Sequence, residues 1–209
     1  MTVKDQMKDL RDDIAFMRAL AEEGRSAPLL GGGILMAAGL IFGAASVAHW
    51  AVMVGALRVS PWAFSAIWIS AGLGFGMLAT LLGRRSKQQA GAAATVNRAA
   101  RAVWSAVGWT IVVILVGMAI MAARLGQPGL MSLFPVIVLP LYGAAWSVAS
   151  AMTRRGWMSA VAFGCYGSAL GMAALGGHAS TLLVYAASLV LFATVPGYLL
   201  LRQEPSHLV

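Results

Sequence analysis

Long uncharged segments alternate along this chain with short segments that carry its charges. Six segments of about 20 residues contain no Asp, Glu, Lys or Arg. These segments are 29–50, 62–83, 103–123, 132–152, 157–176 and 180–201. A helix of this length and apolar character crosses the hydrocarbon core of a bilayer. The pattern therefore predicts an all-α membrane protein, with a bundle of about six transmembrane helices over residues 29–201 and a short cytoplasmic tail at 202–209.

The first 28 residues show a different periodicity, in which apolar residues recur every three or four positions. Val3, Met7, Leu10, Ile14 and Met17 follow one another at spacings of 4, 3, 4 and 3, which places them on one face of a helix. These five residues are named the N-terminal stripe. They predict an amphipathic cytoplasmic helix within residues 1–28, ahead of the first transmembrane segment.

Three surfaces are candidates to cover the N-terminal stripe: another protein or a second copy of this chain, the protein's own cytoplasmic end, or the lipid surface. A helix that lies on a membrane usually has a basic polar face, whereas residues 1–28 carry six acidic and five basic residues. Heptad spacing suits a short coiled coil or a docked helix. The sequence therefore favours a protein partner or homo-oligomer at the stripe and leaves the other two alternatives open.

Composition supports a membrane protein. Of the 209 residues, 60% are hydrophobic and only 11% are charged, too few for the exterior of a small water-soluble domain. The net charge of +8 does not indicate nucleic-acid binding, because the charges lie at the ends of the apolar segments. Arg outnumbers Lys by 12 to 3, and Ala and Gly are abundant. This composition is typical of GC-rich bacteria, so we expect a bacterial inner membrane.

The distribution of basic residues predicts the orientation. Thirteen of the 15 lie in residues 1–28, near 84–102, at 154–155 or at 202, and only Arg58 and Arg124 lie on the opposite side. Because Lys and Arg are retained on the cytoplasmic side, both termini are predicted to be cytoplasmic. Four of these residues are expected to lie together at the level of anionic lipid headgroups. They are Arg84, Arg85, Arg154 and Arg155.

No residues indicate catalysis, a cofactor or a bound metal. Cys165 is the only cysteine and lies inside an apolar segment, where packing is the expected role. His49 and His178 are both predicted near the outer surface, but two ligands without a third make a weak metal site. The apolar segments contain no charged residue, which disfavours an enzyme or an ion-coupled carrier.

Prolines and glycines within the segments leave two packing questions open. Pro135, Pro140 and Pro196 remove backbone donors, so the freed carbonyls either line a cavity or bind neighbouring helices. Glycine pairs four residues apart allow helices to approach closely. They are Gly39 with Gly43, Gly72 with Gly76, and Gly167 with Gly171. Three such pairs are what chance gives in a chain with 24 glycines, so they do not by themselves indicate dimerisation.

Two functions remain compatible with the sequence. The leading hypothesis is a non-enzymatic membrane protein that acts by association, as an accessory, regulatory or assembly subunit of a membrane complex. The alternative is a small transporter or channel for an uncharged or lipophilic solute. A continuous cavity lined by the polar residues of the segments would favour transport, and a packed interior would favour association. The polar residues in question are Ser65, Ser70, Thr110, Tyr142, Ser147, Tyr166 and Tyr185.

Overall fold

The protein is a bundle of α-helices. The computed structural model describes residues 7, 10–15, 17, 28–60 and 62–204. The main helices are α2 (Gly32–Met53), α3 (Trp62–Lys87), α4 (Thr95–Leu125), α5 (Phe134–Thr153), α6 (Gly156–Ala174), α7 (Thr181–Leu189) and α8 (Val195–Leu201). A 3₁₀ helix, η1 (Pro128–Leu133), precedes α5, and a π-helix, η2 (Val190–Thr194), joins α7 to α8. No β-strand occurs among the described residues, so the predicted all-α class is correct for them.

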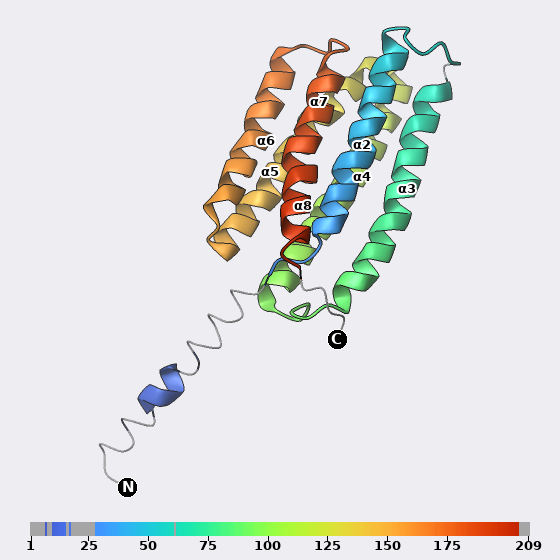
Figure 1. The fold of residues 1–209 in the computed structure, drawn as a ribbon. Helices are drawn as coiled ribbons and strands as arrows, with labels where there is room; N and C mark the ends of the chain where they lie inside the picture. Colours follow the sequence, from blue (N-terminus) through green and yellow to red (C-terminus); the bar gives the residue numbers. More distant parts are fainter. Residues whose placement is uncertain (1–6, 8–9, 16, 18–27, 61, 205–209) are drawn as a thin grey trace.

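The long helices run roughly parallel to one common axis (Figure 1), and α7, η2 and α8 form one continuous helix. The central element is α2, which packs against α3 on one side and against α7, η2 and α8 on the other. Beside this group, α5 packs along α6, and α4 packs on α5 and η1. Consequently α3 and α4 lie at the margins of the bundle. Pro28, at the start of the bundle, and the last described residue, Glu204, lie at the same end.

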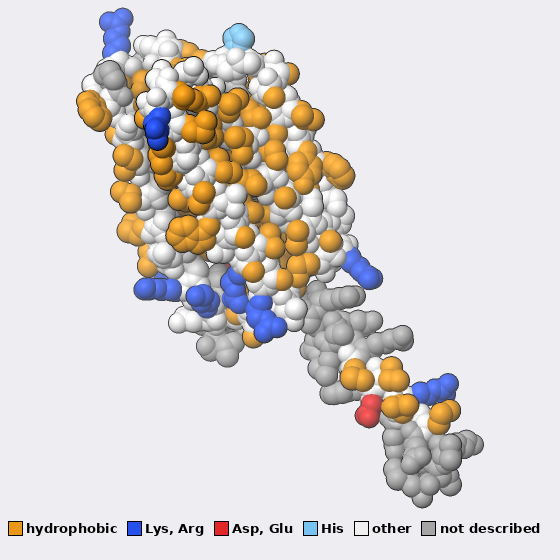
Figure 2. Space-filling view, turned by 180° about the vertical axis from the view of Figure 1, so that it is seen from behind, with side chains coloured by type: hydrophobic (Ala, Val, Ile, Leu, Met, Phe, Trp, Pro, Cys, Tyr) orange, Lys and Arg blue, Asp and Glu red, His pale blue; other side chains and the backbone are white. Residues whose placement is uncertain are grey.

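Five helical segments are long and apolar enough to cross a membrane, which agrees with an integral membrane protein. They are Gly32–Met53, Trp62–Lys87, Thr95–Leu125, Pro128–Thr153 and Thr181–Leu201. Between the fourth and fifth of them lies α6, a helix of 19 residues that packs along α5. Apolar side chains cover the outer surface along the length of the bundle (Figure 2). Such a surface is costly in water and suited to lipid.

Two helices are longer than their apolar segments. The basic residues Arg84, Arg85 and Lys87 form the last turn of α3, and α4 already begins at Thr95. Only residues 88–94 separate the two helices, so most of the basic region near 84–102 is helical. Arg, Lys and Ala are good helix formers, so charge marks the end of a membrane segment without ending its helix.

The last predicted segment is a helix with an altered central turn. Residues 190–194 form the π-helix η2, directly before Pro196. Proline has no N–H to donate to the carbonyl four residues earlier, which here belongs to Phe192. The indole N–H of Trp146 in α5 donates a hydrogen bond of 3.0 Å to that carbonyl. The carbonyl that Pro196 leaves without a backbone donor is therefore bound by a neighbouring helix. This is one of the two outcomes that the sequence left open for this proline, the other being a carbonyl that lines a cavity.

The core lies between α5, α6 and the α7–η2–α8 helix. Its largest fully buried side chains include Leu139, Trp146, Met158, Met172 and Leu189. Cys165 is buried and free, which agrees with a role in packing. Around Trp146, the rings of Trp104 and Trp157 lie at centroid distances of 5.6 and 5.8 Å. Aromatic packing of this kind stabilises the junction of three helices.

Glycine allows α2 to approach the last helix closely. A Cβ on Gly32 would lie 2.5 Å from the carbonyl oxygen of Gly197, and one on Gly39 would lie 2.7 Å from the backbone nitrogen of Thr194. Both distances are shorter than real contacts allow. Gly43 has more room, with Ala186 O at 3.7 Å from the same position. The remaining members of the glycine pairs have no neighbour within 4 Å: Gly72, Gly76, Gly167 and Gly171.

Candidate functional site

Hydrogen bonds from distant segments converge at the end of the bundle where α2 begins. Asn97, in the first turn of α4, is only 1% exposed. Its Oδ1 accepts the N–H of Leu30 at 3.0 Å, and its Nδ2 donates to the carbonyl oxygens of Pro28 and Gly91, each at 3.0 Å. One buried amide therefore holds the residues that connect the N-terminal segment to α2, and it joins them to the turn that precedes α4.

Glu204 provides the second centre of this arrangement. Its Oε1 accepts the N–H groups of Gly31 and Gly32 at 2.9 and 2.8 Å, and Gln89 Nε2 donates to its Oε2 at 3.3 Å. The first backbone N–H groups of a helix have no partner within the helix, and its N-terminus favours negative charge. No local side chain caps α2. A carboxylate from the other end of the chain thus caps the first helix of the bundle.

Two arginines add bonds at the same end. Arg101 Nη2 donates to the carbonyl of Ala92 at 3.0 Å, and Arg155 Nη1 donates to Gln203 Oε1 at 2.6 Å. We name the set Gln89, Asn97, Arg101, Arg155 and Glu204 the basal network. It joins the start of α2, the 88–94 turn, the α5–α6 turn and the C-terminal end of α8. Segments far apart in the sequence are therefore held at one point of the molecule.

The four arginines expected at the lipid headgroups lie at this end but not in one cluster. Arg84 and Arg85 end α3, whereas Arg154 and Arg155 lie between α5 and α6. These two places are on opposite sides of the bundle (Figure 1). Figure 2 shows basic side chains spread along this end. Arg155 also binds Gln203, so its guanidinium has a partner within the protein.

The N-terminal stripe is partly described. Val3 lies outside the described residues. Met7, Leu10, Ile14 and Met17 are helical and exposed by 62%, 60%, 46% and 61% of their surfaces. These four large apolar side chains are thus left uncovered by the described part of the protein.

The two histidines considered for a metal have other partners. His49 Nδ1 accepts a hydrogen bond of 2.9 Å from Trp68 Nε1, and its ring lies 4.7 Å from that of Phe64. His178 Nδ1 contacts the carbonyl of Leu175 in its own turn. Within the described ranges, no group of three or more His, Cys, Asp or Glu residues could hold a metal ion. His49 therefore serves the contact between α2 and α3.

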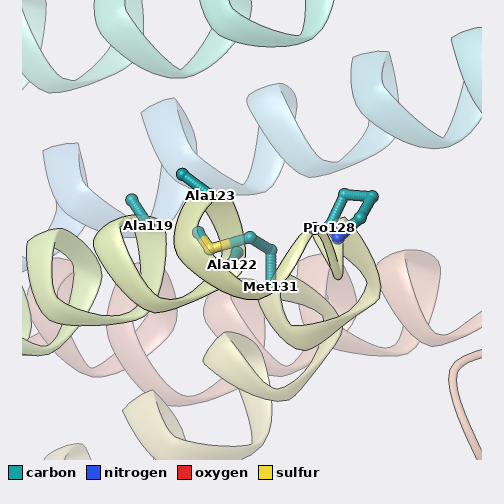
Figure 3. Close-up of a pocket in the computed structure, with 6 residues that line it drawn as sticks. Ala119, Ala122, Ala123, Pro128 and Met131 are labelled. Carbon is teal, nitrogen blue, oxygen red and sulfur yellow. The ribbon is translucent and has the colours of Figure 1, made fainter.

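Two hollows lie near the end of the bundle opposite the basal network. The larger, of about 420 Å³, is lined by Ala119, Ala122, Ala123, Gly126, Pro128 and Met131. In Figure 3 the side chain of Met131 extends from the following turn toward α4, which carries the three alanines. The smaller, of about 190 Å³, includes Ser132 and Thr181 among mostly apolar neighbours. Neither is lined by Pro135, Pro140, Pro196 or the polar residues named above for transport.

Those polar residues are scattered through the bundle. Ser65, Ser70, Thr110 and Ser147 are exposed, whereas Tyr142 and Tyr185 are buried in the core. Ser147 and Tyr166 form a pair, with their oxygens 3.3 Å apart. The structure thus brings one pair together and does not gather the seven side chains around a common space in the described part of the chain.

The basal network is not evident from the sequence alone. The signals were present but uninformative by themselves. Asn97 is the only asparagine of the chain, Glu204 is the only acidic residue after position 23, and Gly31–Gly33 begin a helix without a capping side chain.

Comparison of the chain with protein-family models, with curated proteins and with solved structures gives no match.

Proposed function

We propose that this protein is a non-enzymatic, multi-pass membrane protein that acts by association, as an accessory, regulatory or assembly subunit of a membrane complex in the bacterial inner membrane. In this proposal α6 is the sixth span, and both termini lie in the cytoplasm. The N-terminal stripe is the docking surface for the partner. Membrane lipids surround the bundle, with Arg84, Arg85, Arg154 and Arg155 at the headgroups.

The exposure of the N-terminal stripe is the observation that carries this proposal. Burying a large apolar side chain contributes roughly 1.5–3 kcal/mol relative to leaving it in water. Met7, Leu10, Ile14 and Met17 are about half or more exposed and share one helical face. Such a face is stabilised when protein or lipid covers it. The nearby acidic residues Asp12 and Asp13 disfavour an anionic bilayer, so protein is the better candidate.

The basal network supports a role in regulation or assembly. Asn97 binds Pro28 and Leu30, the residues through which the N-terminal segment joins α2. Glu204 binds the next two residues from the other end of the chain. A protein bound to the stripe would therefore act on a segment that joins the bundle at a junction of several helices. Hydrogen bonds of this kind contribute about 1 kcal/mol each, so a bound partner could shift the junction.

Transport is less well supported by the hollows. The larger one is apolar and lies at one end of the bundle, between α4 and η1. Passage of a solute needs groups that replace its hydration along the whole path. The side chains suited to that purpose lie on different surfaces, as described above. Association therefore remains the preferred function, with transport of an uncharged or lipophilic solute as the alternative.

The proposed orientation predicts a labelling result. A cysteine at Ala90, which is exposed in the 88–94 turn, is expected to react with an impermeant thiol reagent only after cells are permeabilised. Cys165 is fully buried and provides no background. A cysteine at Leu57, exposed at the opposite end, is the control and should react in intact cells. Labelling of position 90 from outside would contradict the orientation.

The docking proposal predicts the effect of charge within the stripe. The double substitution Leu10→Asp and Ile14→Asp should leave the bundle inserted and folded but reduce the fraction of protein in a complex by tenfold or more. The reason is that ionised carboxylates are costly at a buried apolar contact. The measurement is the mass of the solubilised particle by light scattering, together with identification of co-purifying proteins.

The matched control changes the net charge equally on another face of the same helix. Lys8→Gln with Ala15→Asp also lowers the charge by two units, at two positions seven residues apart that lie outside the stripe, and Ala15 is exposed. This control should retain the complex. If the variant with Leu10→Asp and Ile14→Asp keeps the particle mass and the co-purifying proteins of the wild type, the proposal that the stripe docks on protein is wrong.

A further inference from the structure

We propose that the partner of the N-terminal stripe is the same stripe of a second copy, in a parallel two-stranded coiled coil on the cytoplasmic side. This inference rests on the proposed function, because it requires the stripe to dock on protein. It adds the identity of the partner and the direction in which the two helices run. The pattern of core residues, the charges beside them and the position of the segment at the bundle each support it.

The core positions suit a parallel pair. In a heptad register, Met7 and Ile14 occupy position a, and Val3, Leu10 and Met17 occupy position d. The pair Ile14 at a and Leu10 at d is the combination that favours two parallel strands. The four described members of the stripe are exposed in the single chain. They are thus available to form the successive layers of such a core.

The charges beside the core favour the parallel direction. Position e is basic in each heptad, at Lys4, Arg11 and Arg18, whereas position g holds Gln6, Asp13 and Leu20. Of these six, Arg11 and Asp13 are described and exposed, and the others enter by their place in the register. In a parallel pair, g faces the following e of the other helix, so Asp13 meets Arg18 of the second copy. In an antiparallel pair e faces e, and basic residues would oppose one another.

The position of the segment agrees with this direction. Two copies inserted alike in one membrane present their N-terminal segments on the same face. In each copy the segment joins the bundle at Pro28, which Asn97 holds, so the two segments are attached at equivalent points. A short isolated helix is only marginally stable in water. Confinement to one membrane raises the effective concentration of the second strand, which offsets the short length.

Cross-linking of the full-length protein in native membranes tests the direction. Met17 is the last core residue of the stripe. In the Met17→Cys variant, the two cysteines of a dimer therefore face each other in a parallel pair and lie far apart in an antiparallel pair. Disulfides form only between cysteines in close approach. We expect at least a tenfold higher yield of cross-linked dimer for Met17→Cys than for the control Ala15→Cys, which is exposed at position b on the outer face.

Charge reversal tests the register independently of cysteine. Asp13→Arg places like charges together twice in each dimer and should weaken it by about tenfold. Adding Arg18→Asp restores opposite charges between g and e, and should recover most of the loss. If lipid covers the stripe, Asp13→Arg would instead increase binding of the segment to anionic vesicles.

The outcomes separate this inference from the proposed function. Cross-linking at Met17→Cys, with rescue by the double reversal, supports the parallel pair. Loss of a different co-purifying protein in the Leu10→Asp and Ile14→Asp variant, without cross-linking at position 17, overturns the pair and retains docking. Unchanged mass and partners in that variant overturn both.

Discussion

Replacing Gly39 by alanine is expected to lower the free energy of unfolding by about 3 kcal/mol or more, because the added methyl group meets backbone atoms. Its Cβ would lie 2.7 Å from the nitrogen of Thr194 and 2.8 Å from the carbonyl oxygen of Leu189. Neither atom belongs to a side chain that can rotate away. The helices α2 and η2 would have to separate at this point, which weakens the packing between α2 and the last helix.

Denaturant-induced unfolding in detergent or bicelles measures this effect. Gly43→Ala is the matched control on the same helix, since its nearest new contact is an ordinary 3.7 Å to Ala186 O. Gly72→Ala, with nothing within 4 Å, is the control on α3 and should be neutral or slightly stabilising, because alanine is the better helix former. Equal losses for all three variants would show that the close approach at Gly39 does not determine stability.

Replacing Asn97 by alanine is expected to lower stability by about 3 kcal/mol, because three backbone groups lose their partner at a buried position. The N–H of Leu30 and the carbonyls of Pro28 and Gly91 are the groups concerned. The loss should concentrate at the start of α2. Hydrogen exchange of the Leu30 amide should accelerate by tenfold or more, while amides in the α5–α6 core keep their protection.

Gln88→Ala removes a neighbouring amide side chain that is exposed, and it should change neither stability nor exchange at Leu30. A third variant, Asn97→Asp, retains an acceptor for Leu30 but loses both donated bonds, and we expect an intermediate loss of stability. If Asn97→Ala unfolds like the wild type and Leu30 exchanges at the same rate, the basal network does not hold this end of the bundle.

Much of the architecture could be predicted from local patterns. The segment 132–152 lies within η1 and α5, and 62–83 lies within α3, because twenty uncharged apolar residues satisfy a bilayer only as a helix. The basic residues that end α3 and precede α6 lie at one end of the bundle, where the basic pattern predicted them. The N-terminal stripe was also visible locally, since helical spacing alone places its members on one face.

The sites of close contact could not be predicted in this way. Gly39 and Gly72 each belong to a glycine pair with the same spacing, yet only Gly39 meets another backbone. The difference lies in how each helix is rotated within the bundle, which the packing of all helices decides together. Likewise, nothing in the sequence distinguishes Trp146 from the other tryptophans, of which the chain has seven in all. Its hydrogen bond to the carbonyl of Phe192, which Pro196 leaves without a backbone donor, forms only in the folded bundle.

The division between the two levels follows from the range of the interactions. Hydropathy, charge at segment ends and helical periodicity are properties of neighbouring residues, so the amino-acid sequence determines the apolar helices, their basic ends and the apolar face of the N-terminal segment. The basal network joins residues 67 and 173 positions apart, Leu30 with Asn97 and Gly31 with Glu204. Such pairs meet only when the intervening helices are packed, because each amide or carboxylate alone is equally compatible with solvent. Tertiary structure therefore decided which polar residues bind residues 28–32, where the N-terminal segment joins α2.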